Sequence, residues 1–550
     1  MIITLIVTLL RLLQQPHDQI SDGIFPHKIQ IEAKLEQIKW KNKNIFVEKI
    51  PKCVKRHFYA DSFVCVCNST FCDQPEEIGE FTGKNAFAYQ TDLVEQRLNM
   101  KELKIQKKTI KGDKIALENE VKIRINASRQ YQKILGFGGA FTDAAGYNLN
   151  LLSRNTRMQL LRSYFDKNIG IRYTVGRVPI ASCDFSTRVY SYCDTINDFK
   201  LNTFALAEED LHMKIPHILT ANILAGSPLK LFASPWSAPA WMKTSGKMPG
   251  GGTLRFFEEY ALLANITFWG MTIENEPQYG LDPGYSFQAM WVSPVTQRNF
   301  ANNILSPILK SSPAAKNVLI MAHDDTRNII LDAAKKIFGN KNNLTTSNNV
   351  IAGLAYHWYS FCSHSVLSDI HNLYPDKFIF GTEACTGWTG HDRGVSLGNW
   401  TRAMMYGRDI LRGLQNWAIG WTDWNLCLDL KGGPNWVKNY VDSPIIVNIT
   451  SDEFYKQPMF YAMAHFSRFI SPGSVRIDSQ ISSLTQQIES VAFRNPNGNR
   501  VLVLISNSEE SIEGIIEEEI IENNGEVKIR TINVNLPGNS ITTVIWPKMK

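Results

Sequence analysis

Short apolar runs and longer amphipathic stretches alternate along the middle of the chain. The apolar runs are rich in β-branched and aromatic residues, and each is long enough for a buried strand but too short for a helix. Eight such runs cover residues 134–138, 172–178, 229–234, 268–273, 318–322, 351–358, 378–382 and 417–423. Amphipathic stretches lie between most of them, and eight strand–helix units over roughly 290 residues predict an α/β fold, a (β/α)8 TIM barrel.

The pattern on either side of this region is that of strands without helices. Alternating apolar and polar residues at 103–105 and 121–125 come before it, and after about residue 475 strand-like runs are separated by turn sequences such as Pro-Asn-Gly. We expect the later runs, at 490–493, 501–505, 526–532 and 542–546, to form an all-β sandwich domain that takes in the early strands. The prediction assigns residues 78–131 and 474–550 to the sandwich and residues 132–425 and 458–473 to the barrel.

The first thirteen residues, MIITLIVTLLRLL, form an apolar run that is too short to span a bilayer. They resemble the apolar region of a signal peptide, but Arg11 interrupts the run, no basic segment precedes it and no A-x-A cleavage sequence follows. Residues 14–50 are polar and rich in lysine, so we expect residues 1–50 to be a signal-like and poorly ordered segment.

Composition narrows the function classes only a little. A hydrophobic fraction of 44% and a charged fraction of 20% are ordinary for a globular protein. The net charge of +6 is scattered, without a basic block interleaved with aromatics, so we expect no nucleic-acid partner; weak attraction to an anionic membrane surface stays open. Thirteen Trp and eighteen Tyr are more than a core requires, and flat rings are what sugar faces stack on.

Four of the nine cysteines, Cys53, Cys65, Cys67 and Cys72, lie within twenty residues. Two disulfides would explain this cluster, and a zinc site is the alternative, although C-x-C with one distant cysteine on each side fits the usual zinc spacings poorly. Disulfides would mean an oxidising compartment, but the spacing does not determine which cysteines pair. The other five are expected to be buried or free thiols: Cys183, Cys193, Cys362, Cys385 and Cys427.

Two of the expected strands run directly into carboxylates. Residues 268–277 read F-W-G-M-T-I-E-N-E-P and residues 378–385 read F-I-F-G-T-E-A-C, which places Glu276 and Glu383 at the carboxyl ends of the fourth and seventh strands. Ligands bind at that end of a barrel, and glycoside hydrolysis needs one carboxyl to protonate the leaving oxygen and a second to attack or to activate water. The alternative for each glutamate alone is a helix cap or a partner for a nearby arginine. Two together in aromatic surroundings favour a glycosidase.

Further motifs stand in order along the chain: R-V-P-I-A-S-C-D-F-S from residue 177, A-S-P-W-S-A-P-A-W-M-K-T from 233, A-Y-H-W-Y from 355, G-W-T-D-W-N from 420 and G-G-P-N-W from 432. With the two glutamate motifs and the cysteine cluster, they resemble the glucosylceramidases (acid β-glucosidases) of glycoside hydrolase family 30, from about residue 53 to residue 546. The resemblance implies a retaining β-glucosidase that hydrolyses glucosylceramide by double displacement, with Glu276 as acid/base and Glu383 as nucleophile. It implies no cofactor and no metal.

The resemblance also implies a set of substrate-binding residues. Those expected to hold the glucose are Asp184, Trp236, Asn275, Trp424 and Asn439, and those expected to border the lipid aglycone are Tyr285 and Phe287. Tyr359 and His357 are expected to orient the surroundings of the nucleophile, with Arg177 in a supporting role; Asp324, Asp325 and Arg327 resemble a network of charges behind the site. Plainer alternatives are an ion pair of Asp184 with Arg177 or Arg188, a core position for Trp236 and a structural role for His357.

Other features follow from the same resemblance. The bonds Cys53–Cys65 and Cys67–Cys72 are implied, in a small disulfide-bonded antiparallel sheet made by residues 51–77 and 426–457. Implied partners are a membrane glycosphingolipid substrate, an anionic lipid surface and a saposin-type activator protein, in a lysosomal protein that reaches its compartment through the secretory pathway and lies peripheral to the membrane. Six N-x-[S/T] sequons are about as many as chance would give, so they are no more than candidate glycosylation positions.

The chain departs from the family pattern in one place. Between Trp241 and Phe268 it is distinctly shorter, which leaves about three helical turns, ~16 Å, for the third barrel helix. Two other hypotheses about the function stay open. One is a relative of the same barrel clan with another sugar or aglycone, such as a β-xylosidase or a steryl β-glucosidase. The other is an inactive, carbohydrate-binding paralogue.

Overall fold

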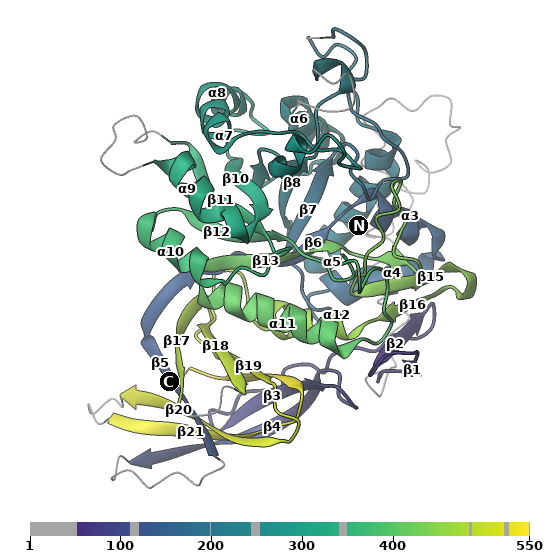
Figure 1. The fold of residues 1–550 in the computed structure, drawn as a ribbon. Coiled ribbons are helices and arrows are strands. Elements are labelled where there is room, and N and C mark those ends of the chain that lie inside the picture. Colours follow the sequence, from purple (N-terminus) through teal and green to yellow (C-terminus); the bar gives the residue numbers. More distant parts are fainter. Residues whose placement is uncertain are drawn as a thin grey trace, which may run out of the picture.

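The computed structural model describes residues 52–109, 120–198, 200–243, 253–339, 349–482, 487–521 and 527–548. The signal-like segment expected at residues 1–50 lies outside them. The described strands form three sheets: a closed parallel barrel, a closed nine-stranded sheet and a five-stranded sheet. Figure 1 shows the barrel above the nine-stranded sheet, with helices α11 and α12 between the two and the small sheet at one side.

The eight strands of the barrel follow one another in sequence order around the ring, each parallel to the next. They are β6 (Gly136–Ala140), β7 (Val175–Ile180), β8 (Lys230–Pro235), β9 (Gly270–Thr272), β10 (Leu319–Thr326), β11 (Ile351–His357), β12 (Phe378–Glu383) and β13 (Ala418–Asn425). Each of the eight apolar runs overlaps one of these strands, because a strand buried on both faces needs a continuous apolar run. The TIM barrel predicted from the sequence is confirmed.

Glycines close this ring where backbones approach one another. At Gly138 an added Cβ would lie 1.9 Å from the carbonyl oxygen of Val175 in β7, and at Gly420 it would lie 2.1 Å from the carbonyl oxygen of Gly136. Gly420 and Gly136 face each other in the closing pair of β13 with β6. A side chain at either position would push adjacent strands apart, which explains the glycine-rich start of the barrel.

Helices cover the outside of the barrel. They are α3 (Asp143–Leu151), α4 (Arg154–Phe165), α5 (Ile215–Ala225), α6 (Thr253–Ala264), α7 (Pro294–Phe300), α8 (Ser306–Ser311), α9 (Ile330–Phe338), α10 (Ser365–Leu373), α11 (Trp400–Gln415) and α12 (Pro458–Ser467). Helix α6 follows the third strand and has 12 residues, the three turns expected, and α4 is no longer. No helix of the described residues combines the length and the apolar character needed to cross a bilayer.

The nine-stranded sheet joins the two ends of the chain. Its order is β17-β18-β19-β22-β3-β4-β21-β20-β5, and β5 pairs again with β17 to close it. The strands are β3 (Asn85–Asp92), β4 (Asn99–Thr109), β5 (Glu120–Lys133), β17 (Val475–Ile481), β18 (Ile488–Arg494), β19 (Arg500–Ser506), β20 (Ile512–Ile521), β21 (Val527–Leu536) and β22 (Ser540–Trp546). The early strands thus pair with the late ones, as expected. Strands β3, β17 and β20 were not predicted.

The small sheet has the order β1-β2-β16-β15-β14. Its strands are β1 (Lys55–His57), β2 (Phe63–Asn68), β14 (Leu428–Asp429), β15 (Ile445–Asn448) and β16 (Glu453–Lys456). The structure pairs the cysteines as the resemblance implies, Cys53 with Cys65 and Cys67 with Cys72, and the other five are free. The sheet is antiparallel except for β14, which pairs with β15 in parallel.

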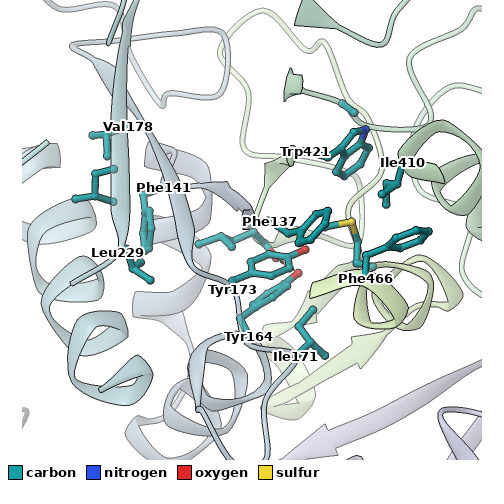
Figure 2. Close-up of a cluster of buried hydrophobic side chains, with 14 of the residues drawn as sticks. Phe137, Phe141, Tyr164, Ile171, Tyr173, Val178, Leu229, Ile410, Trp421 and Phe466 are labelled. Atoms are coloured by element: carbon teal, nitrogen blue, oxygen red, sulfur yellow. Dashed lines mark hydrogen bonds between the residues drawn. The ribbon is translucent and has the colours of Figure 1, made fainter. Parts of the chain in front are cut away.

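Helix α12 lies at the centre of the molecule, and all ten of its residues are buried. Phe466 packs against Phe137 of β6, with ring centroids 6.3 Å apart (Figure 2). On the other side, the ring nitrogens of His465 lie 2.9 Å from the hydroxyls of Thr543 and Thr91 in the nine-stranded sheet. The helix therefore contributes to the barrel core and also fixes the barrel against the second domain.

Candidate active site

The carboxyl end of β9 turns sharply and points Glu276 into the barrel mouth. Pro277 begins a short 3-10 helix (Pro277–Leu281), and it cannot continue a strand. Glu276 adopts a left-handed backbone conformation with φ of 45°, and its N–H donates to the carbonyl oxygen of Asp324 at 2.9 Å. Such a conformation is costly for a non-glycine residue and is typical of functional sites.

Glu383 approaches from the end of β12, three strands further around the barrel. Oxygen atoms of Glu276 and Glu383 and a ring nitrogen of His357 all lie within 4.8 Å of one another. Both glutamates are more than 90% buried. This brings together the two carboxylates that the sequence predicted as a catalytic pair.

The two glutamates line a cavity of about 310 Å³ at the barrel mouth. All the residues expected to bind substrate line it as well: Asp184, Trp236, Asn275, Tyr285, Phe287, Tyr359, Trp424 and Asn439. The sequence could place them there because almost all follow strand ends, which meet at one face of a barrel. It did not single out Tyr279, Trp388 and Arg393, which also line the cavity.

Glu383 is held by a cation on one oxygen and a hydroxyl on the other. Arg177 on β7 donates from Nη1 to Oε2 of Glu383, and the hydroxyl of Tyr359 donates to Oε1 at 2.9 Å. Burial raises the pKa of Glu383, and the positive charges of His357 and Arg177 oppose that rise. These contacts favour the ionised form that a nucleophile requires.

Glu276 is held by a different partner, His357 at the end of β11. Nδ1 of His357 lies 2.9 Å from Oε1 of Glu276, and Nε2 lies 3.1 Å from Oδ1 of Asp324. His357 therefore donates to Glu276 and Asp324, and one of its ring nitrogens also lies within 4.8 Å of an oxygen of Glu383. Its place in the surroundings of Glu383 agrees with the expectation, although its hydrogen bonds go to other carboxyls. Burial alone would lower the pKa of His357, but the charge of Glu383 and the bonds to Asp324 and Glu276 raise it to about 10. The imidazole is thus a cation with both nitrogens donating.

Asp324 connects the two sets of contacts behind the glutamates. Besides His357 it accepts from Nη2 of Arg177 at 3.0 Å and from the hydroxyl of Thr382 at 2.7 Å. Its side chain is fully buried; burial would raise its pKa, but the charge of Arg177 and the hydrogen bond from His357 hold the pKa of Asp324 well below its usual range. One ionised carboxylate thereby positions both of the cations that contact Glu276 and Glu383.

The backbone of β10 explains how Asp324 reaches this position. His323 and Asp324 both have positive φ, 78° and 49°, at a register shift between β10 and β11. Such a bulge re-aims a side chain, here into the barrel axis. Arg327 does not take part: it pairs with Asp409 at 2.9 Å, while Asp325 accepts from Gln278, so the three charges expected as one network belong to separate contacts.

The far wall of the cavity carries the polar groups expected to bind sugar. Oδ2 of Asp184 accepts from the amides of Asn435 and Asn439, at 3.2 and 3.0 Å. Arg177 does not pair with Asp184, and Arg188 pairs with Glu209 instead, so the ion-pair alternative is wrong. Burial raises the pKa of Asp184 to about 7, although the two amide bonds lower it.

Aromatic rings form the floor and the rim. Trp236 and Trp424 stack with centroids 5.2 Å apart, and Arg177 lies over both rings. At the rim, Tyr285 stacks on Tyr279 at 4.7 Å and contacts Phe287 at 4.5 Å. The cavity therefore offers a polar, aromatic interior and an apolar entrance.

Two domains of one protein family match most of the chain. Residues 134–470 match the glycosyl hydrolase family 30 TIM-barrel domain, and residues 473–544 match the β-sandwich domain of the same family. The chain is a member of glycosyl hydrolase family 30.

Relatives in family 30 extend the match to nearly the whole chain. A Caenorhabditis elegans protein named "Putative glucosylceramidase 3" is 44% identical over 507 residues, covering 89% of this chain and 93% of the relative. The lysosomal acid glucosylceramidase of Mus musculus is 38% identical over 515 residues, covering 90% and 95%. The solved structure of an endo-β1,6-glucanase superposes with a TM-score of 0.70 at 26% identity, covering 85% of this chain and all of that chain.

The family 30 site also contains a set of atoms that could contact a metal ion, those of Glu276, His357 and Glu383. Both nitrogens of His357 already face carboxylates, and its raised pKa keeps it protonated. A protonated imidazole is not a metal ligand. The arrangement favours acid–base and nucleophilic chemistry over metal binding.

Proposed function

We propose that the protein is a retaining β-glucosidase that hydrolyses glucosylceramide to glucose and ceramide. The separation of the two catalytic carboxylates supports this proposal most directly. Their oxygens lie within 4.8 Å, close to the ~5–5.5 Å of retaining glycosidases and well below the ~6.5–9.5 Å that inverting enzymes need for a water molecule.

The contacts of each glutamate support a division of roles. Glu383 receives bonds from Arg177 and Tyr359, which favour the carboxylate, so it attacks the anomeric carbon and forms a glycosyl-enzyme. Oε1 of Glu276 is engaged by His357, which leaves Oε2 to give its proton to the leaving oxygen. In the second step Glu276 takes a proton from water, and the hydroxide displaces the sugar from Glu383.

The relatives and the cavity both support the proposed substrate class. Two relatives of 44% and 38% identity carry the name glucosylceramidase, and the rim residues Tyr279, Tyr285 and Phe287 offer an apolar entrance for a lipid. We extend the proposal to an anionic membrane surface and a saposin-type activator as partners. The two disulfides suit an oxidising compartment, and the mouse relative is named lysosomal, so we propose a lysosomal location.

A competition between substrates tests the proposal. Purified full-length protein is given glucosylceramide in anionic phospholipid vesicles, with and without a saposin, in parallel with β-1,6-glucan and with aryl β-xyloside at pH ~5. We expect kcat/KM for the lipid to exceed the other two by at least tenfold, and anionic vesicles to raise it. Preference for β-1,6-glucan, the substrate class named for the structural relative, would contradict the lipid assignment and keep the retaining mechanism.

A further inference from the structure

A second cavity, of about 350 Å³, lies on the other side of the β9 carboxyl end. Its walls are mainly apolar and include Ile180, Pro235, Ile273, Met290 and Phe300. Among the described residues it shares none with the sugar-binding cavity. A volume in this range is at the lower end for ligand pockets, which span ~300–1,000 Å³.

One carboxyl group faces this apolar space. Glu274 lines the cavity and is 2% exposed, and its Oε1 has no hydrogen-bond partner within the described part of the chain. Lys243 is the cation whose charge acts most on Glu274. It forms no ion pair with Glu274 in the described part of the chain, and its Nζ donates to the carbonyl oxygen of Ala289 at 2.7 Å. Burial raises the pKa of Glu274 well above its usual range, which favours the neutral acid, a hydrogen-bond donor.

Within the described part of the chain, no residue of α6 lines the cavity. That helix packs through Phe257 and Tyr260 on Phe268, with ring centroids 5.2 and 5.5 Å apart, below the strand end. The outer wall comes instead from α7 and the segment before it. Trp291 and Phe300 line the cavity and are 44% and 36% exposed, which makes them its rim toward solvent.

We propose that this cavity binds a single-chain neutral amphiphile, whose apolar body fills the space and whose polar end accepts a hydrogen bond from Glu274. A buried carboxyl oxygen without a partner among the described residues is costly, and an acceptor such as an amide or ester carbonyl would satisfy the protonated group. A charged head group would meet a mainly apolar wall and lose its hydration. The volume suits one alkyl chain. This site is additional to the sugar-binding cavity and does not depend on which glycoside the protein cleaves.

Octanamide is a suitable probe because it combines one chain with one carbonyl acceptor. Its binding to the full-length protein is measured by calorimetry in wild type, Glu274→Gln and Glu274→Leu. Gln keeps an N–H donor of nearly the same shape, so we expect its Kd to stay within threefold of wild type. Leu removes the donor, and we expect at least tenfold weaker binding. Equal binding to the Leu variant, or no saturable binding to wild type, would overturn the proposal.

A substitution that fills the second cavity tests whether octanamide binds there. Val292 lines the cavity near its rim, and Val292→Trp should occupy the space and abolish octanamide binding while hydrolysis of a small aryl β-glucoside continues. A sugar-shaped inhibitor that saturates the sugar-binding cavity should leave the Kd of octanamide unchanged in wild type. Competition between the two, or undiminished binding to a folded Val292→Trp protein, would place the probe elsewhere and overturn the proposal. If Val292→Trp does not fold, the Glu274 pair decides.

Discussion

The two cavities beside β9 surround a glutamate side chain with different partners. Glu276 and Glu274 are two residues apart, but Glu276 faces a cavity in which the His357 cation contacts it. Glu274 faces an apolar cavity, and its Oε1 has no hydrogen-bond partner among the described residues. On the first side the charges of Arg177 and His357 balance buried carboxylates. On the second side Glu274 has no such ion pair among the described residues, and burial favours its neutral form. Environment, more than residue type, decides whether a glutamate can do catalysis.

The largest effect is expected from substitutions of Glu276 and Glu383. Glu383→Gln and Glu276→Gln should each lower kcat on a fluorogenic β-glucoside at pH ~5 by several orders of magnitude, because each deletes one of the two essential carboxyls. Added azide should partly restore turnover of an activated substrate only in Glu276→Gln, where the glycosyl-enzyme still forms. Rescue of Glu383→Gln with unchanged stereochemistry would reverse the roles assigned to the two residues.

The next largest effect is expected at Asp324, which positions the cations that contact both glutamates. Asp324→Asn should lower kcat by about 10²-fold, because it weakens the positioning of both Arg177 and His357. It should also shift the pH–rate profile, because the carboxylate of Asp324 helps to raise the pKa of His357. Asp325→Asn is the matched control: it is the next residue, its carboxylate contacts Gln278 instead, and we expect a change of less than fivefold. Equal losses in the two variants would show that Asp324 has no special role.

A smaller effect is expected at the nucleophile. Tyr359→Phe removes the hydroxyl that donates to Oε1 of Glu383 and keeps the ring. Because a hydrogen bond to a charged group contributes about 1.5–3 kcal/mol, we expect roughly a tenfold to hundredfold loss in kcat/KM. The kinetics of an aryl β-glucoside measure it, and an unchanged value would mean that Arg177 alone holds Glu383 in its reactive form.

The smallest effect concerns stability. The pKa of Asp184 is raised to about 7 in the folded protein, against about 3.9 in an unfolded chain. The folded state therefore binds this proton more tightly, and its contribution to stability is full below pH ~4 and lost as the pH rises to 7. Asp184→Asn cannot titrate, so its fall in Tm between pH 5 and pH 7.5 should be smaller than that of wild type by a few degrees. A fall as large as in wild type would contradict the raised pKa.

Much of this arrangement could be predicted from the sequence, for identifiable reasons. Buried parallel strands need continuous apolar runs, so the eight strands and the carboxyl ends that carry Glu276 and Glu383 were visible as a pattern. The backbone reversals at His323 and Asp324 were not, because a bulge leaves no mark on apolar periodicity. Without that bulge, the common partner of Arg177 and His357 could not be found.

The same limit explains what was missed elsewhere. The family resemblance places His357 in the surroundings of Glu383, but which carboxyl its nitrogens contact depends on side-chain geometry. The sequence I-E-N-E-P does not distinguish Glu274 from Glu276. The turn after β9 places Glu274 in the apolar cavity and Glu276 in the cavity at the barrel mouth. The apolar cavity itself arises from residues distant in the sequence, from Ile180 to Phe300, and has no local signature.

The most direct test of the account is to trap the glycosyl-enzyme. Wild-type protein is incubated at pH ~5 with a 2-deoxy-2-fluoro-β-glucoside carrying a good leaving group, which slows the second step, and the digest is read by mass spectrometry. The account predicts one added fluoroglucosyl group on the peptide that contains Glu383, and none in Glu383→Gln. A label on Glu276 or Asp184, or hydrolysis with inversion and no label, would contradict it.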